Sequence, residues 1–353
     1  MDKQQKAEAG VTLAYLSGFD DIIDARTPAE FAEDHLPGAI NLPVLDDEER
    51  VRVGTMYKQV SSFEAKKIGA ALVAKNIARH IEESLIAKPK GWRPLIYCWR
   101  GGNRSGAFAH ILTRIGWRAE QLDGGYKAYR RNVQEMLETL PKRLNYRVVC
   151  GATGSGKSRL LAALAQLGAQ VLDLEGLAAH RGSLLGSLPD EAQPSQKGFD
   201  SRLWAALQGF DSSKPVFVEA ESKKIGNVRA PDALLDVMWQ SPCVRLEADA
   251  DLRVALLMEE YRHFLDDPAA LNLKLDYLVK LYGKAVIARW QEMALKREWA
   301  PLVAELLAQH YDPAYTRSSR QHYPHYDDAL VLPVGGIRAA DFEALARKAV
   351  AAA

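Results

Sequence analysis

The chain has 353 residues, of which 48% are hydrophobic and 26% charged, and its formal net charge at pH 7 is +1. This length is typical of about two globular domains, each large enough to bury a core. The balanced charge excludes a chain that attracts polyanions through bulk charge, so any affinity for nucleic acid must come from local patches.

The N-terminus and the cysteines bear on the cellular compartment. The opening MDKQQKAEAG lacks the apolar core of a signal peptide, and the chain contains no run of about 18 apolar residues that would predict a membrane span. The three cysteines have no regular spacing and predict no disulfide framework. We therefore expect a cytoplasmic protein with no membrane association and with free thiols.

The first part of the chain alternates strand-like and helix-like segments. In chain order, the patterns predict a strand at 19–26, a helix at 27–35, a turn at 37–43, a helix at 63–87, a strand at 92–98, a helix at 105–117, and a strand followed by a turn at 121–131. Strands separated by helices indicate a parallel α/β sheet.

The pattern restarts after Pro141. A strand, a glycine loop, a helix and a strand are predicted over 147–175, and further strands at 215–221, 243–249 and 329–334. The long charged helical stretch at 251–312 exceeds an ordinary crossover. We predict an N-terminal parallel-sheet domain at 1–135, a linker at 136–145, and a C-terminal α/β domain at 146–353 with a helical insertion at about 251–312.

A single cysteine follows the strand at 92–98, in the segment YCWRGGNRSG. A thiol becomes nucleophilic as thiolate, which backbone N–H groups, a helix N-terminus and arginines stabilise. Gly101 and Gly102 allow successive N–H groups to point inward, and Arg100 and Arg104 would bind an oxyanion. Cys98 is therefore the candidate catalytic nucleophile.

Other interpretations of the thiols remain open. The loop has the C-x5-R spacing of a protein tyrosine phosphatase, although no convincing general acid accompanies it. A structural cysteine at a strand end is the plainer alternative, and we favour it for Cys150 and Cys243, which border apolar strands without glycines or arginines beside them.

GATGSGKS matches the phosphate-loop pattern G-x4-G-K-[ST] and lies between a predicted strand and a predicted helix, which is the context the motif requires. Its backbone N–H groups would cradle a diphosphate at the helix N-terminus, with the lysine reaching the terminal phosphate and the serine hydroxyl on a possible Mg²⁺. The candidate diphosphate-binding residues are Gly151, Gly154, Gly156, Lys157 and Ser158. We assign no other metal to this loop.

Acidic residues close the next two predicted strands. Asp173 and Glu175 follow one strand, and Glu219 and Glu221 follow the other. Asp173 and Glu219 are candidates for acid–base catalysis or metal binding, and an ordinary solvated strand end is the alternative.

The N-terminal part, roughly residues 10 to 135, resembles the rhodanese domain. The resemblance rests on DARTPAEFAEDHLPGAINLP, on the cysteine loop and on LDGGYKAYR, in this order. The loop CWRGGNRS is one residue longer than in common single-domain rhodaneses and contains Trp99. This departure indicates a larger or different chalcogen donor than thiosulfate or a plain persulfide.

The whole chain resembles tRNA 2-selenouridine synthases. Besides the two loops, DLEGLAAHRGSLLG (173–186) and FVEAESKKIG (217–226) carry this resemblance, to about residue 250. It implies conversion of 2-thiouridine at position 34 of tRNA to 2-selenouridine, through S-geranylation by geranyl diphosphate and then selenation by selenophosphate. It also implies that Cys98 carries selenium, that the arginine loop binds selenophosphate, and that the phosphate loop binds geranyl diphosphate.

The same resemblance fixes the expected ligands and partners. Selenophosphate and geranyl diphosphate are co-substrates, no tightly bound organic cofactor is expected, and Mg²⁺ is possible. The partners are the anticodon region of a tRNA and an enzyme that supplies selenophosphate.

A segment near the C-terminus, YTRSSRQHYPHYDD, alternates basic and aromatic residues. Such a pattern suits phosphates and unstacked bases, so Arg317, Arg320, Tyr323 and Tyr326 are candidate tRNA contacts. The helical stretch at 251–312 also carries many basic residues, but acidic residues are mixed among them, and a solvated surface explains them nearly as well.

Two other functions compete with this interpretation. One is a rhodanese-type sulfurtransferase whose phosphate loop binds ATP in a regulatory or kinase domain. The other is a non-catalytic binding module for sulfur-relay partners, which the intact loops disfavour.

Overall fold

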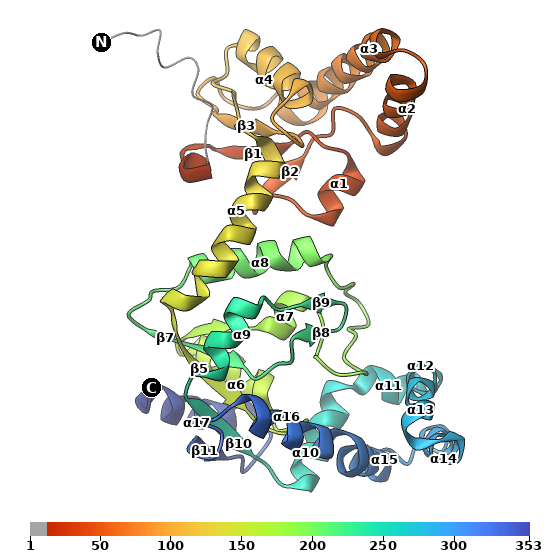
Figure 1. The fold of residues 1–353 in the computed structure, drawn as a ribbon, viewed down its shortest axis with the longest axis vertical. Helices are drawn as coiled ribbons and strands as arrows, with labels where there is room; N and C mark the ends of the chain where they lie inside the picture. Colours follow the sequence, from red (N-terminus) through yellow and green to blue (C-terminus); the bar gives the residue numbers. More distant parts are fainter. Residues whose placement is uncertain (1–12) are drawn as a thin grey trace. The chain divides into compact units, whose positions relative to one another are not determined.

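The computed structural model describes residues 13–353, apart from the side chains of residues 14, 15, 314, 316 and 318–320. The described chain forms two compact units (Figure 1). One unit contains the chain up to Met136 together with Lys197–Ala205, and the other contains Leu137–Gln196 and Ala206–Ala353.

The first unit is built on a parallel four-stranded sheet with the order β2-β1-β3-β4. Its strands are β1 (Asp21–Asp24), β2 (Ala39–Asn41), β3 (Pro94–Tyr97) and β4 (Glu120–Gln121). All four residues of β3 are buried, as expected for a central strand covered on both faces. The segment at 37–43, predicted as a turn, contributes β2, which pairs with β1 over only three residues.

Helices surround this sheet. They are η1 (Leu13–Gly18), α1 (Pro28–Glu33), α2 (Asp47–Gln59), α3 (Ser62–His80), η2 (Ile81–Leu85), α4 (Asn103–Ile115) and α5 (Gly125–Thr139). Ile77 of α3 and Phe108 of α4 pack with Ile23 and Ile96 of the strands in one core cluster. The sequence patterns did not predict α2, which buries no residue and therefore has no apolar stripe.

Helix α5 replaces the turn predicted at 121–131 and extends into the predicted linker. Tyr126, Tyr129, Val133 and Leu137 are all buried. Their spacing of three and four residues places them along one helical face. The preceding Gly124 has a φ of +66°, so the glycine pair forms a turn before the helix rather than instead of it.

The segment Lys197–Ala205 lies within α8 (Gln196–Gln208), and this part of the helix packs with the first unit. Lys197 Nζ lies 2.7 Å from Glu33 Oε1, and Arg130 forms an ion pair with Asp200. The domain limits drawn from sequence stay a prediction, and the compact units differ from them at this segment.

The second unit contains a parallel five-stranded sheet with the order β11-β10-β5-β7-β6. Its strands are β5 (Asn145–Cys150), β6 (Gln170–Leu172), β7 (Pro215–Glu219), β10 (Cys243–Glu247) and β11 (Leu330–Pro333), and a separate ribbon pairs β8 (Lys224–Ile225) with β9 (Val228–Arg229). The chain moves from β5 to one side of the sheet and later returns to the other. Ligands of open α/β sheets bind beyond the carboxyl ends of the strands at such a reversal.

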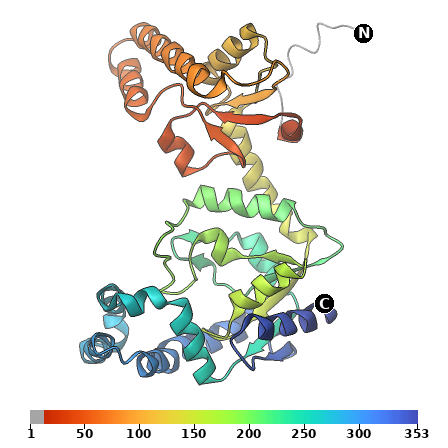
Figure 2. The same ribbon diagram turned by 180° about the vertical axis from the view of Figure 1, so that it is seen from behind.

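Helices α6 (Lys157–Gln166) and α17 (Ala339–Ala351) pack side by side on this sheet, as Figure 2 shows from behind. Leu160 and Leu164 of α6 meet Phe342 and Leu345 of α17 in the core. The unit also contains α7 (Leu174–Ala178) and α9 (Asp232–Trp239).

The predicted helical insertion is present and has a core of its own. It comprises α10 (Ala250–Glu260), α11 (Arg262–Asp266), α12 (Pro268–Leu275), η4 (Asp276–Leu278), α13 (Val279–Tyr282), α14 (Lys284–Leu295), α15 (Trp299–Leu306), η5 (Leu307–Tyr311) and α16 (Asp312–His322). Trp290, fully buried, lies in a cluster with Leu275 and Leu302. Among residues 13–353, no helix combines the length and apolar character needed to cross a membrane. The predicted α/β fold class is confirmed.

Candidate functional site

Cys98 directly follows β3, as the sequence predicted, and α4 begins five residues later at Asn103, two residues before its predicted start. The side chain is only 3% exposed. Gly102 is the N-cap of α4. The sulfur therefore lies near a helix N-terminus, where the unpaired N–H groups favour negative charge.

The backbone of the cysteine loop is fixed by α5. The N–H groups of Tyr126 and Lys127 donate to the carbonyl oxygens of Cys98 and Trp99, at 2.9 and 3.0 Å. Gly101 has a φ of +63°, and a Cβ at this position would lie 2.7 Å from the carbonyl oxygen of Leu122. Only glycine fits there without a backbone shift.

The surroundings of Cys98 favour its thiolate. Burial raises the pKa of the thiol, but hydrogen bonds from the side chain and backbone of Ser105, the Arg104 charge and a hydrogen bond at Gly102 outweigh it, and the net pKa is lowered. Ser105 Oγ lies 3.1 Å from Cys98 Sγ and is itself held by Gln121 Nε2 at 2.8 Å. A lowered pKa increases the thiolate fraction at neutral pH.

The two loop arginines differ in their environment. Arg104 Nη1 donates to Glu30 Oε2 at 2.8 Å. Burial raises the pKa of Glu30, but the hydrogen bond and charge of Arg104 and a backbone hydrogen bond from Thr27 lower it overall. Arg100 is exposed. The assignment of both arginines to an oxyanion stays a prediction.

The phosphate loop joins β5 to α6 in the predicted context. Gly154 and Gly156 have φ values of +78° and +87°. Lys157 Nζ donates to the carbonyl oxygen of Gly151 at 2.7 Å, and the N–H of Gly151 donates to Tyr315 Oη at 2.5 Å. Tyr315 comes from α16, more than 150 residues away, and sequence reasoning gave it no role at this loop.

The carboxylates predicted at the strand ends do meet beside the phosphate loop. Glu219 is 2% exposed, and its Oε1 accepts the N–H of Glu175 at 2.7 Å. Burial, then the neighbouring Glu221 charge, raises the pKa of Glu175 to about 8, and burial also raises the pKa values of Glu219 and Glu221. Glu175 and Glu221 share a hydrogen bond, so one of them is protonated at neutral pH.

Asp173 has a structural contact of its own. It is the N-cap of α7, and its Oδ1 accepts the N–H of Gly176 at 2.7 Å. Ser158 Oγ lies 3.4 Å from Glu175 Oε2. Within the described chain, no three His, Cys, Asp or Glu side chains are arranged to hold a metal ion, so Mg²⁺ at Ser158 stays a prediction.

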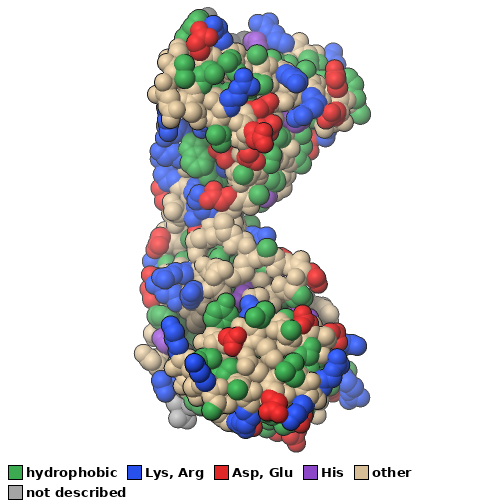
Figure 3. Space-filling model, turned by 90° about the vertical axis from the view of Figure 1, so that its right-hand side faces the viewer, with side chains coloured by type: hydrophobic (Ala, Val, Ile, Leu, Met, Phe, Trp, Pro, Cys, Tyr) green, Lys and Arg blue, Asp and Glu red, His purple; other side chains and the backbone are tan. Residues whose placement is uncertain are grey.

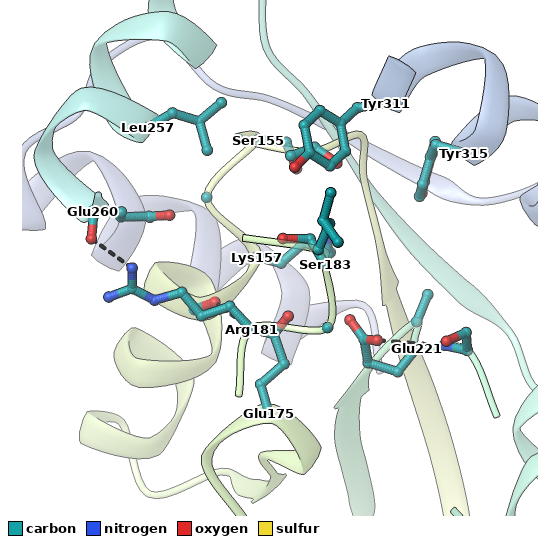
Figure 4. Close-up of a pocket in the computed structure, with 18 of the residues that line it drawn as sticks. Ser155, Lys157, Glu175, Arg181, Ser183, Glu221, Leu257, Glu260, Tyr311 and Tyr315 are labelled. Carbon is teal, nitrogen blue, oxygen red and sulfur yellow. Dashed lines mark hydrogen bonds between the residues drawn. The ribbon is translucent and has the colours of Figure 1, made fainter. Parts of the chain in front are cut away.

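A cavity of about 320 Å³ opens over the phosphate loop. Besides the loop, Glu175, Glu221 and Tyr323, it is lined by residues that the sequence patterns did not indicate, among them Arg181, Tyr261, Tyr311 and Tyr315. In Figure 4, Leu257 and Tyr311 lie on one side of Lys157, and Glu175 and Glu221 lie on the other. Arg181 Nη1 donates to the carbonyl oxygen of Glu260 at 2.5 Å.

The predicted tRNA contacts do not all lie on one exposed surface. Tyr323 is only 5% exposed and lines the phosphate cavity, so it does not share an open surface with the others. Arg317 is exposed on α16, and Tyr326 is half-buried, with its ring 5.1 Å from the Arg245 guanidinium carbon. The side chain of Arg320 lies outside the described part of the structure.

The face shown in Figure 3 does not single out a nucleic-acid surface. In Figure 3, Lys and Arg side chains are mixed with Asp and Glu side chains on the visible face of each unit. The tRNA surface therefore stays a prediction.

Cys150 and Cys243 are buried on neighbouring strands. A hydrogen bond with Cys243, followed by burial, raises the pKa of the Cys150 thiol well above its ordinary value. Its raised pKa makes Cys150 a poor nucleophile, which agrees with the structural role favoured for it from the sequence, whereas the same hydrogen bond lowers the pKa of the buried Cys243 thiol.

Comparison with known proteins matches both units. A family model described as "Rhodanese-like domain" matches residues 12–132, and one described as "tRNA 2-selenouridine synthase AAA domain" matches residues 144–274. Proteins named tRNA 2-selenouridine synthase are similar along most of the chain. The one from Alcanivorax borkumensis is 34% identical over 342 residues, covering 86% of this chain and 91% of that protein.

Two further relatives with the same name support this match. The protein from Nitrosomonas europaea is 36% identical, covering 68% of this chain and 63% of its own. The protein from Shewanella denitrificans is 33% identical, covering 83% and 87%. The chain belongs to the tRNA 2-selenouridine synthase family.

Proposed function

We propose that this protein converts 2-thiouridine at the wobble position of tRNA to 2-selenouridine, in a geranylation step followed by a selenation step. The observation that supports it most is that a thiol of lowered pKa and a phosphate loop occur in one chain of this family. Each loop suits one step, because the first stabilises a nucleophilic sulfur and the second binds a diphosphate.

The phosphate loop serves geranylation. The sulfur of 2-thiouridine attacks C1 of geranyl diphosphate, the S–C bond forms, and the C1–O bond breaks as pyrophosphate leaves with its electron pair. Lys157 and the loop N–H groups stabilise the charge that develops on pyrophosphate. The uridine N3 proton passes to a base, for which the deprotonated partner of the Glu175–Glu221 pair is the nearest candidate at this loop.

Cys98 serves selenation. Its thiolate attacks the selenium of selenophosphate, the S–Se bond forms, and the Se–P bond breaks with its electron pair on phosphorus, giving a phosphite-level product. The Cys98-bound selenium then attacks C2 of the uridine and geranyl thiolate leaves. A thiol reductant attacks Cys98 Sγ, and the S–Se bond breaks with its electron pair on selenium, which releases 2-selenouridine. A second thiol then reduces the mixed disulfide left on Cys98.

The proposed partners follow from these steps. They are a tRNA that carries 2-thiouridine in its anticodon and an enzyme that supplies selenophosphate, and no tightly bound organic cofactor is required. Mg²⁺ would neutralise charge on the diphosphate, and Ser158 together with the partnerless buried Oε2 of Glu219 offers the oxygen donors that it prefers.

The decisive experiment separates the two steps on one substrate. Thiolated tRNA is incubated with geranyl diphosphate, selenophosphate and a thiol, then digested, and the wobble nucleoside is identified by mass. We expect 2-selenouridine with the wild type, S-geranyl-2-thiouridine with Cys98→Ala, and unchanged 2-thiouridine with Lys157→Ala.

Cys243→Ala is the matched control for loss of a thiol, because Cys243 is buried in the second unit. An unchanged nucleoside with the wild type would refute the proposal and favour the sulfurtransferase alternative, which predicts thiosulfate:cyanide activity and ATP turnover without RNA. Selenation by Cys98→Ala would refute the Cys98-bound selenium alone.

A further inference from the structure

An apolar chamber adjoins the phosphate cavity. Thr153, Leu257, Tyr261 and Tyr311 line both spaces, so the two are neighbours. Leu257 packs directly on the phosphate loop, because a Cβ at Gly154 would lie 2.8 Å from Leu257 Cγ. Any ligand whose phosphates occupy the loop therefore has this chamber beside it.

The chamber is narrow and apolar. Its volume is about 60 Å³, and none of the described residues that line it carries a charge. Beyond the shared residues, its walls come mainly from the helical insertion and include Phe264, Trp299, Leu302, Val303 and Leu306, with Leu185 from the segment after α7.

We propose that this chamber holds the hydrocarbon chain of an allylic diphosphate, and that Trp299 and Val303 limit the length of that chain. The inference rests on the proposed function for the identity of the diphosphate. It adds where the hydrocarbon chain is bound and which residues limit its length.

The chemistry of the walls favours a hydrocarbon over a nucleoside. A nucleobase and a ribose carry donors and acceptors, which lose their hydrogen bonds to water in an apolar chamber and find few partners there. A hydrocarbon chain gains from the same transfer, by about fourfold in affinity for each buried methylene. The apolar side of the cavity in Figure 4, at Leu257 and Tyr311, is the side from which such a chain enters.

Trp299 and Val303 are the lining residues best suited to limit the length of the bound hydrocarbon chain. Both lie on α15, one turn apart, and both are only partly buried, whereas the neighbouring Leu302 is fully buried and belongs to the core of the insertion. A larger side chain at Val303 shortens the chamber with little change to that core. A smaller one at Trp299 lengthens the chamber and removes the contacts that Trp299 makes with the core.

The test measures binding to the full-length protein by calorimetry, without tRNA. The probes are inorganic pyrophosphate and the five-, ten- and fifteen-carbon diphosphates dimethylallyl, geranyl and farnesyl diphosphate. We expect the wild type to bind geranyl diphosphate at least 100-fold more tightly than pyrophosphate. Val303→Phe should weaken geranyl binding about tenfold and leave pyrophosphate and dimethylallyl binding unchanged, and Trp299→Ala should tighten farnesyl binding.

Ala304→Phe is the matched control, because Ala304 follows Val303 on α15 and is exposed. It should change none of the affinities. If Val303→Phe does not fold, Leu185→Phe narrows the chamber from the segment after α7.

The outcomes separate this inference from the proposed function. Equal affinity of the wild type for pyrophosphate and geranyl diphosphate overturns the chamber, even if the protein geranylates tRNA. Equal weakening of all four probes by Val303→Phe also overturns it. Chain-length-dependent binding without transfer to thiolated tRNA upholds the chamber and refutes the proposed function.

Discussion

The cysteine loop and the phosphate loop have the same order of local elements, but they differ in how far neighbouring helices cover them. Each follows a parallel strand, β3 or β5, and leads into a helix, α4 or α6. In the first unit, α5 closes over the loop, and Cys98 is 3% exposed. In the second unit, the loop opens on a cavity of about 320 Å³. The comparison teaches that the same strand–loop–helix unit can hold its loop buried or leave it open to a cavity, depending on the packing above it.

The largest effect should come from a substitution that disturbs the backbone of the cysteine loop. Gly101→Ala places a Cβ against the carbonyl oxygen of Leu122 in a left-handed conformation, which should destabilise the loop by about 2–3 kcal/mol. We expect loss of selenation with geranylation retained, measured by mass analysis of the wobble nucleoside.

The neighbouring glycine provides the control for this change. Gly102 has a φ of −100°, and a Cβ there would meet no described atom within 4 Å. Gly102→Ala should therefore leave both steps nearly intact. Equal damage from the two substitutions would mean that loop closure by Leu122 is unimportant.

A smaller effect is expected when the thiolate loses its hydrogen-bond donor. Ser105→Ala removes the hydroxyl 3.1 Å from Cys98 Sγ, so the pKa of Cys98 should rise. The rate of alkylation by iodoacetamide at pH 7 should fall about tenfold, since a hydrogen bond to a charged group is lost. Ser105→Thr restores the hydroxyl and should restore the rate. An unchanged pH profile for Ser105→Ala would contradict this explanation of the reactive thiol.

At the phosphate loop, removing a hydrogen bond should strengthen ligand binding rather than weaken it. Tyr315→Phe removes the hydroxyl that accepts the Gly151 N–H and leaves this donor available to a diphosphate. We expect pyrophosphate to bind about 2- to 10-fold more tightly, as measured by calorimetry. Tyr326→Phe, whose ring lies near Tyr315 at 6.4 Å between centroids, is the control and should have no effect. Weaker binding by Tyr315→Phe would show that the hydroxyl helps to hold the ligand.

The smallest effect concerns pH. The pKa of Glu175 rises from an ordinary value of 4.5 to about 8, so between these values the unfolded chain releases a proton that the folded chain keeps. The contribution of Glu175 to the free energy of unfolding must therefore fall as pH rises from 4.5 to 8. Glu175→Gln should remove part of this decline, raising the Tm at pH 8 by about 3 °C while changing it little at pH 5. Glu138→Gln, at an exposed position of α5, should shift the Tm equally at both pH values.

Local motifs account for what the sequence could predict. Cys98 with its glycines and Gly151–Ser158 are contiguous segments, so their spacing already carries the geometry of their loops. Short apolar runs likewise predicted most strands of both sheets. Helix α5 was missed because a glycine pair at its start has the signature of a turn.

Contacts between distant segments account for the features that the sequence could not predict. Tyr315 reaches Gly151 across 164 positions, and Tyr323 is buried against the same cavity although its neighbours in sequence are polar. Nothing in the pattern of residues 312–322 indicates which side of that helix faces the phosphate loop. The assignment of Lys197–Ala205 to the first unit depends on ion pairs with Glu33 and Arg130, which are equally invisible in a linear pattern.

The way α5 holds the cysteine loop has a consequence for protein engineering. The fastening uses the main-chain N–H groups of Tyr126 and Lys127, which every residue except proline supplies. A library that varies the exposed Lys127 side chain therefore retains the position of Cys98, whereas replacing the buried Tyr126 side chain disturbs the core of the unit, and inserting or deleting a single residue between Leu122 and Tyr126 moves both donors out of reach. Selenium donors of other sizes are better sought by changing the identity of residues along α5 than by changing the length of the segment before it.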